Sequence, residues 1–185
     1  MQTDIQGISY GLIMNSFRMK KLTLSKWVLV MVLIFAFTSC DTVEKEVSST
    51  AISRKQNEAD FNTTLQKHLD AVMSKDLVAL KATMSPKGNM ELIQPSSEIV
   101  FGVDGFMKFH QDWFALPDWT VETIILSTDV GDNMGVATTE FMYREPERNG
   151  KPYFNRLIVS YTLHKMDGQW HVIKDHASSI EKTKS

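Results

Sequence analysis

Five histidines are the residues of this chain best suited to acid–base chemistry, since imidazole titrates near neutrality. Their spacing contains neither His-x-His nor His-Glu-x-x-His, so the sequence predicts no metal site. It also lacks a Gly-rich phosphate loop and a Ser-centred nucleophile elbow, and we expect no cofactor. Proton transfer by a histidine is therefore the chemistry that the chain could perform unaided.

Asp175 and His176 are neighbours on a predicted strand, where successive side chains point to opposite faces. We therefore do not expect them to act as a pair. His176 alternates with Trp170 and Val172, which predicts that these three side chains share one face of the strand. His176 is thus the better pocket candidate of the two neighbours.

The only cysteine, Cys40, follows a leader of the secretory type. Residues 27–37 form an uncharged apolar run with lysines before it and small residues after it. The run is shorter than the roughly 20 apolar residues that cross a bilayer. These features predict a signal peptide over residues 1–39, and a single cysteine allows no disulfide within the chain.

The sequence Phe37-Thr38-Ser39-Cys40 resembles the lipobox of bacterial lipoproteins, although Phe37 stands where Leu is usual. The resemblance implies that Cys40 becomes the mature N-terminus and carries acyl chains, palmitate among them. More than one chain gives stable membrane anchoring. We therefore expect an exported, lipid-anchored protein of the cell envelope, at the periplasmic face or the outer membrane. Residues 1–18 add little to the signal, so translation from Met19 or Met14 is a further hypothesis.

Residues 40–54 are polar and low in aromatics, which predicts a lipidated, flexible tether. Residues 55–185 are then long enough for one domain. Four of the 20 basic residues and one of the 22 acidic residues precede Cys40, which leaves 16 basic and 21 acidic. This negative balance argues against a nucleic-acid partner, because phosphate binding needs a basic face.

The order of predicted elements is helices first and strands afterwards. Phe61, Leu65, Leu69 and Val72 recur at helical spacing. Asp76 is a suitable N-cap for a short second helix. The sequence predicts helices over residues 55–74, 76–84 and 103–114, one or two short strands within 90–101, and strands over 119–128, 134–144, 153–165 and 170–178. This order indicates an α+β domain.

That order of elements, with Lys75-Asp76, Phe101-Gly102 and a final Asp167-Gly168-x-Trp170 strand, resembles the nuclear transport factor 2-like superfamily. Its SnoaL-like and ketosteroid isomerase-like branches are nearest, and the resemblance covers residues 57–179. It implies a cone-shaped fold, with N-terminal helices packed on a curved antiparallel sheet around a pocket. It also implies a homodimer through the open sheet face, where Val136 and Met142 are apolar. Such folds host isomerases, cyclases, dehydratases and binding modules.

Ketosteroid isomerisation needs a carboxylate base and two buried donors. Counting along the chain places His68 at the position of the family tyrosine, Gln94 at that of the base and Ser160 at that of the protonated aspartate. Gln94 takes no proton at neutral pH, and Ser160 is a weaker donor than a carboxylic acid. The resemblance therefore does not extend to this reaction.

The candidate pocket residues have ordinary alternatives. His68 could be a hydrogen-bonded residue at the edge of the core, Trp113 could pack in the core, and Arg156 could be solvated or paired with Glu140. The candidates are His68, Gln94, His110, Trp113, Arg156, Ser160 and His176.

Two functions remain open. One is a noncatalytic module for a small apolar or amphipathic ligand, or for a partner protein. The other is an isomerase, cyclase or dehydratase-type enzyme that uses a pocket histidine as acid and base. A histidine hydrogen-bonded to an ionised carboxylate would favour the enzyme. A pocket lined mainly by Met and aromatic side chains, without such a pair, would favour binding.

Overall fold

The computed structural model describes residues 40–184, with side chains from residue 51 onward, so the predicted signal peptide and the Cys40 side chain lie outside the described parts. Residues 47–184 belong to one compact unit, and its α+β class agrees with the prediction. The elements are α2 (Cys40–Ser74), α3 (Leu77–Ala82), β1 (Glu91–Ile93), β2 (Ile99–Phe101), α4 (Gly102–Phe114), β3 (Thr120–Val130), β4 (Met134–Arg148), β5 (Lys151–Met166) and β6 (Gln169–Lys182).

Helix α2 is longer than predicted, because it begins at Cys40 rather than near Lys55. Residues 41–54, for which the polar composition predicted a flexible tether, are helical. They contain no Gly or Pro, and a helix already formed by residues 55–74 extends at little cost once its first turns exist. Within residues 40–184, no helix is long and apolar enough to cross a membrane.

The apolar stripe of α2 packs against the sheet as predicted, since Phe61, Leu65, Leu69 and Val72 are all buried. Phe61 meets Trp170 of β6 edge to face, with ring centroids 5.2 Å apart. Gly135 of β4 allows this approach, because a Cβ at that position would lie 2.6 Å from Cε2 of Phe61.

Helix α3 begins where the sequence predicted. Oδ1 of Asp76 accepts hydrogen bonds from the backbone N–H groups of Val78 and Ala79, each at 2.9 Å. The helix ends at Ala82, and Val172 of β6 donates its backbone N–H to the carbonyl of Thr83 at 2.9 Å. The chain after α3 is thereby fixed to the sheet.

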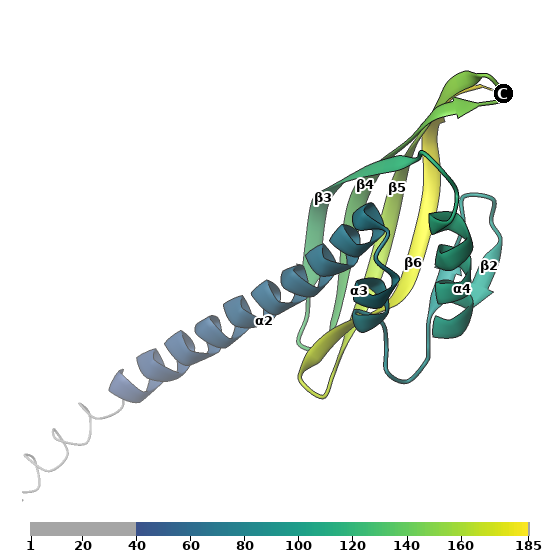
Figure 1. Cartoon of the computed structure of the whole chain (residues 1–185). Helices are drawn as coiled ribbons and strands as arrows, with labels where there is room; N and C mark the ends of the chain where they lie inside the picture. Colours follow the sequence, from purple (N-terminus) through teal and green to yellow (C-terminus); the bar gives the residue numbers. More distant parts are fainter. Residues whose placement is uncertain (1–39, 185) are drawn as a thin grey trace, which may run out of the picture. The chain divides into compact units, whose positions relative to one another are not determined.

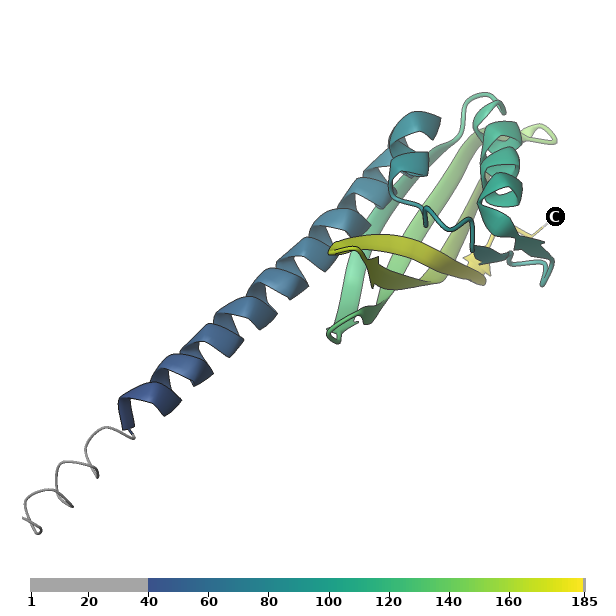
Figure 2. The same cartoon turned by 90° about the horizontal axis from the view of Figure 1, so that it is seen from below.

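The sheet has the strand order β2-β1-β6-β5-β4-β3. Strand β1 runs parallel to β6, and the other neighbouring pairs are antiparallel. Asn149-Gly150 and Asp167-Gly168 have positive φ at both positions, as tight hairpin turns require. Figures 1 and 2 show the helices gathered on one face of the curved sheet, which leaves the opposite face open.

Alternation gives the sheet an inner face under the helices and an outer face. On β5, Leu157, Val159 and Tyr161 are buried inward, whereas Ser160 is exposed. On β6 the alternation is interrupted, because the register with β5 shifts between Thr162 and Leu163. One extra residue in β6 at this bulge reverses the faces of the residues that follow.

Candidate ligand-binding site

A pocket of about 260 Å³ lies between α4, the β1 segment and the inner face of the sheet. A cavity of roughly 150 Å³ holds benzene, so the pocket has room for a molecule somewhat larger than one aromatic ring. Its wall is mostly apolar and includes Val72, Leu92, Phe109, Trp113, Phe141 and Leu157.

A larger hollow of about 730 Å³ lies between α2 and the β5–β6 turn, but its lining is of another kind. Asp60, Lys67 and Asp70 are among its residues, and the side chains of Lys67 and Asp70 are exposed. Small-molecule sites are usually apolar with a few directed polar groups. We therefore place the candidate site in the smaller, apolar pocket.

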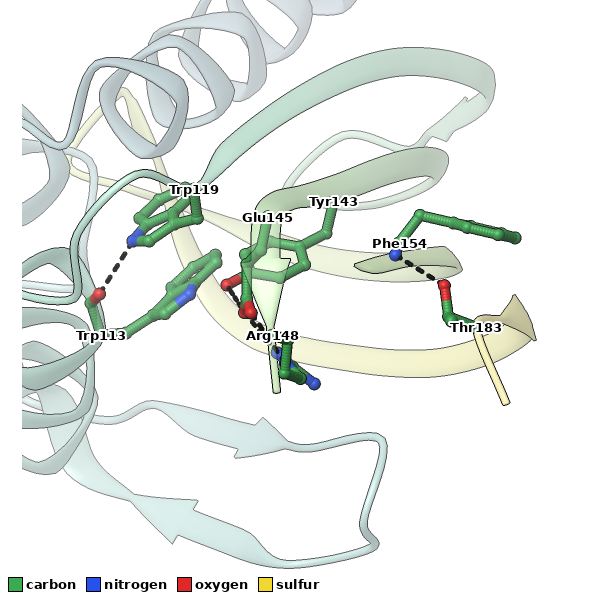
Figure 3. A network of polar contacts seen from close by, with 7 residues as sticks. All are labelled: Trp113, Trp119, Tyr143, Glu145, Arg148, Phe154 and Thr183. Atoms are coloured by element: carbon green, nitrogen blue, oxygen red, sulfur yellow. Dashed lines mark hydrogen bonds and ion pairs between the residues drawn. The ribbon is translucent and has the colours of Figure 1, made fainter. Parts of the chain in front are cut away.

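Trp113 of α4 lies in the wall of the pocket, and an aromatic ring from the segment after α4 packs against it. Trp113 stacks on Trp119 with ring centroids 4.5 Å apart and planes 8° from parallel. The Trp119 indole N–H donates to the carbonyl of Trp113 at 3.0 Å, which fixes the stack. Tyr143 of β4 lies next to both rings (Figure 3).

A polar network adjoins this wall (Figure 3). The Tyr143 hydroxyl donates to Oε1 of Glu145 at 2.5 Å, and Nε of Arg148 donates to Oε2 of Glu145 at 2.7 Å. Arg148 also lies over the Tyr153 ring, 3.5 Å from its centroid. The Arg148 hydrogen bond lowers the pKa of Glu145, and burial raises the pKa of Tyr143 to about 12. The charge of Arg148 is therefore already paired within the protein.

His110 of α4 lines the pocket and is buried. Its Nδ1 lies 2.9 Å from the carbonyl oxygen of Phe106. A carbonyl only accepts, so Nδ1 carries the proton and Nε2 is an acceptor. Burial lowers the pKa of His110 to about 4, against the opposing effect of the Phe106 hydrogen bond. At neutral pH, His110 is uncharged.

His68 of α2 is fully buried but does not line the pocket. The Thr83 hydroxyl donates to the carbonyl of Leu80 at 2.7 Å, so it accepts from Nδ1 of His68 at 2.8 Å. Burial, and secondarily the proximity of His110, lower the pKa of His68 to about 3. His68 is thus a hydrogen-bonded core residue, which was one of its two predicted roles.

Asp175 is the acidic residue among those lining the pocket. Its side chain is 6% exposed, and Oδ1 has no hydrogen-bond partner in the described part of the chain. Burial raises the pKa of Asp175 to about 7. Its register partner Tyr161 also lines the pocket, and burial and then Asp175 raise the pKa of that phenol. A buried carboxyl group that titrates near neutrality in a cavity is a mark of a functional site.

Three predicted pocket residues lie on the outer face instead. Ser160 and His176 are exposed opposite each other on β5 and β6. The prediction that His176 shares a face with Trp170 and Val172 is wrong, because the bulge before Lys174 reverses the alternation. Arg156 donates two hydrogen bonds to Glu140, at 2.9 and 2.7 Å, which is the cross-sheet pair considered for it.

Gln94, His110 and Trp113 line the pocket, as we expected. Sequence reasoning missed Asp175 and Asn155, which also line it. The alternation of β5, with Leu157 and Val159 inward, could have placed Asn155. No sequence signal marks the bulge that turns Asp175 inward. Among the residues whose side chains the structure describes, no group of three or more His, Cys, Asp or Glu is placed to hold a metal ion.

Residues 61–181 match the SnoaL-like domain family. A comparison with proteins of curated function found no match. The fold is similar to that of hexachlorocyclohexane dehydrochlorinase from Novosphingobium barchaimii LL02, with a TM-score of 0.63, 13% identity and coverage of 72% of this chain and 92% of that chain.

Two further solved structures share the fold. A ketosteroid isomerase-like protein from Erwinia carotovora atroseptica SCRI1043 has a TM-score of 0.58 and 16% identity, covering 66% of this chain and 95% of that chain. The association domain of C. elegans CaMKII has a TM-score of 0.52 and 21% identity, covering 68% and 98%. At these identities the similarity concerns the fold alone. Since the family match spans well over half of the chain, the protein belongs to the SnoaL-like domain family of the nuclear transport factor 2-like superfamily.

Proposed function

We propose that this protein binds a small, largely apolar molecule in the pocket under α4. The observation that carries the proposal is the lining, which is apolar and aromatic with a few separate polar groups. His110 is held by a backbone carbonyl and His68 by Thr83, so in the described residues neither histidine is hydrogen-bonded to a carboxylate. The histidine–carboxylate pair that would favour acid–base catalysis is therefore missing from these residues, and aliphatic side chains rather than the expected Met accompany the aromatic ones in the lining.

A search for co-purifying molecules tests the proposal. The full chain is purified, extracted with organic solvent and analysed by mass spectrometry. We expect a small molecule that is retained by the wild type and by His176→Ala, whose side chain lies on the outer face. Ala177→Phe, which fills the pocket from β6, should lose it. Equal retention by Ala177→Phe would show that the molecule binds elsewhere and would contradict the proposal.

An acid–base enzyme is the second candidate, and Asp175 is the observation that favours it. We expected a pocket histidine in that role, but burial keeps His68 and His110 uncharged at neutral pH. Asp175, with a pKa of about 7, is suited to proton transfer there. A steroid isomerisation assay should give no turnover above the buffer rate. Turnover that Asp175→Asn abolished would reverse our preference.

The proposed binding protein is exported and attached to the cell envelope through lipid on Cys40. The apolar leader and the lipobox-like sequence before Cys40 support this. Because buried acyl chains supply the affinity for the membrane, Cys40→Ser should move the protein to the soluble fraction. Equal membrane association of mutant and wild type on fractionation would rule out this anchor.

We also propose a homodimer through the outer face of the sheet. Ile124, Leu126 and Val136 on β3 and β4 are 61%, 51% and 49% exposed. Apolar side chains gathered on an open sheet face are better explained by a protein partner than by water. The C. elegans CaMKII structure with this fold is an association domain, which is compatible with assembly.

A further inference from the structure

The pocket contains polar atoms without partners, and these atoms are acceptors when Asp175 is ionised. Oδ1 of Asp175 and Oδ1 of Asn155 are buried and have no hydrogen-bond partner among the described residues. Nε2 of His110 is an acceptor as well, because Nδ1 of that ring donates to Phe106. Leaving buried acceptors unpaired costs free energy. A ligand that restores these hydrogen bonds must therefore supply donors.

The groups packed around Asp175 provide no free positive charge. His68 on α2 and His110 on α4 are neutral, and Tyr161 on β5 is a neutral phenol. Arg148 on β4 is bound to Glu145. Among the other ionisable groups of the adjoining strands, Tyr143 on β4 donates to Glu145, Glu91 on β1 pairs with Lys174 at 3.0 Å, and His176 is exposed on the outer face.

The walls of the pocket suit a cation. Phe109, Trp113, Phe141 and Tyr161 place aromatic rings around the cavity. The face of an aromatic ring attracts a positive charge, and the attraction is greater where water is excluded. The fold has already removed Asp175 from water, so the cost of dehydrating that carboxylate does not arise again on binding. An anionic ligand would meet the same carboxylate as a repulsive charge.

We propose that the ligand of this pocket is an organic amine, whose ammonium group pairs with Asp175 and whose apolar body of one or two rings lies among the aromatic walls. The inference rests on the proposed binding function and names its ligand class. The carboxylate repels phosphates, carboxylates and other anions, and a neutral donor gains hydrogen bonds and apolar contacts but no ionic pairing with Asp175.

A matched series of small probes tests the assignment. Phenethylamine, 2-phenylethanol and phenylacetate each contain one phenyl ring and differ in the charge of the attached group. Differences in their affinities therefore report the effect of charge. Titration calorimetry at pH 8 on the purified full chain should show the amine binding about tenfold or more tightly than the alcohol. Phenylacetate should bind more weakly than both.

Two variants separate the carboxylate from the rest of the pocket. Asp175→Asn keeps the side-chain size and removes the charge, so the amine should lose its advantage over the alcohol. His176→Asn alters the next residue on the opposite face and should leave the advantage unchanged. Circular dichroism checks that each variant is folded.

Proton release gives a readout that needs no variant. The amine requires ionised Asp175, whereas burial leaves about half of the groups protonated near pH 7. Binding at pH 6 should therefore release protons, detected as a dependence of the heat on the ionisation enthalpy of the buffer. At pH 8 the release should be smaller, and amine affinity should rise between these pH values.

The possible results test the amine assignment separately from the proposed binding function. If the alcohol binds as tightly as the amine and Ala177→Phe blocks both, the pocket is a binding site and the amine assignment is wrong. If the amine binds without releasing protons at pH 6, Asp175 is not its partner, and the assignment is likewise wrong. If none of the three probes binds, the assignment fails, while the co-purification experiment judges the proposed function separately.

Discussion

On the outer face of the sheet, Arg156 donates two hydrogen bonds to Glu140, and Nζ of Lys174 lies 3.0 Å from Oε1 of Glu91. On the inner face, Asp175 has no hydrogen-bond partner for Oδ1 within the described chain. Ion pairs between water-exposed side chains change the stability of the fold very little. A carboxyl group under the helices must instead take up a proton or acquire a partner, which is why the inner face is the one suited to a ligand.

The two environments are one residue apart along β6. Asp175 is 6% exposed, whereas His176 and Lys174 on either side of it point outward. The bulge preceding them decides which of these neighbours enters the pocket. A change of one residue in register would place His176 inside, where the sequence had predicted it.

The largest expected effect comes from placing a new charge on each face of β5. Val159→Asp puts an unpaired carboxylate on the inner face and should lower the free energy of unfolding by about 3–5 kcal/mol. Ser160→Asp, one residue along on the outer face, should change it by less than about 1 kcal/mol. Urea unfolding of both variants measures the contrast. Similar losses in the two variants would show that the faces do not differ in burial.

Removing the charge of Asp175 should have the opposite effect. Burial raises the pKa of Asp175 from 3.8 to about 7, so the folded protein binds more protons than the unfolded chain between these values. This contribution to stability is complete below pH 3.8 and is lost as the pH rises through 7. Asp175→Asn should therefore be more stable than the wild type at pH 8 by about 1–3 kcal/mol. The difference should shrink toward pH 4.

The control for this effect is His176→Asn, which should leave the unfolding free energy unchanged at both pH values.

In Asp175→Asn, the pH dependence of stability should come mainly from the two buried histidines. Its sign should be opposite to that of the Asp175 contribution. The pKa values of His68 and His110 are lowered from 6.5 to about 3 and about 4. Their contribution is present above pH 6.5 and is lost as the pH falls toward those values. A gain in stability on acidification from pH 6.5 to 4 would contradict this assignment.

A charge introduced on the outer face of the sheet should weaken the proposed dimer. Val136→Glu places a carboxylate among the exposed apolar side chains of β3 and β4 and should weaken dimerisation by about 10- to 100-fold. Light scattering at micromolar concentration follows the mass. Lys81→Glu, an exposed change on α3, should leave the mass unaltered. A wild-type monomer under these conditions would refute the dimer.

The smallest expected effect is that of the outer ion pair. Arg156→Gln removes the partner of Glu140, but in the monomer both side chains contact water, which replaces the lost hydrogen bonds. The melting temperature should stay within the error of the measurement. A fall as large as that of Val159→Asp would show that the pair is buried in the working assembly.

Local features of this fold followed from the sequence. The apolar residues of α2 recur at helical spacing, Asp76 accepts the first N–H groups of α3, and Asp167-Gly168 forms the turn before the final strand. Each depends on contacts within a few residues, so the local pattern contains the needed information. The extent of α2 did not follow, because polar composition reports exposure and not backbone conformation.

Some residues of the candidate site were likewise predictable from the sequence, and others were not. Gln94, which the family resemblance placed at a pocket position, lines the pocket together with His110 and Trp113 of α4. The face of the sheet that Asp175 and Ser160 occupy depends on strand register. The register of β5 with β6 shifts at a bulge that no residue type marks, and a shift of one position exchanges the two faces. The sequence alone therefore determined which elements form and in what order. The tertiary structure decided which side of the sheet each functional group faces, because pairing between distant strands sets that choice.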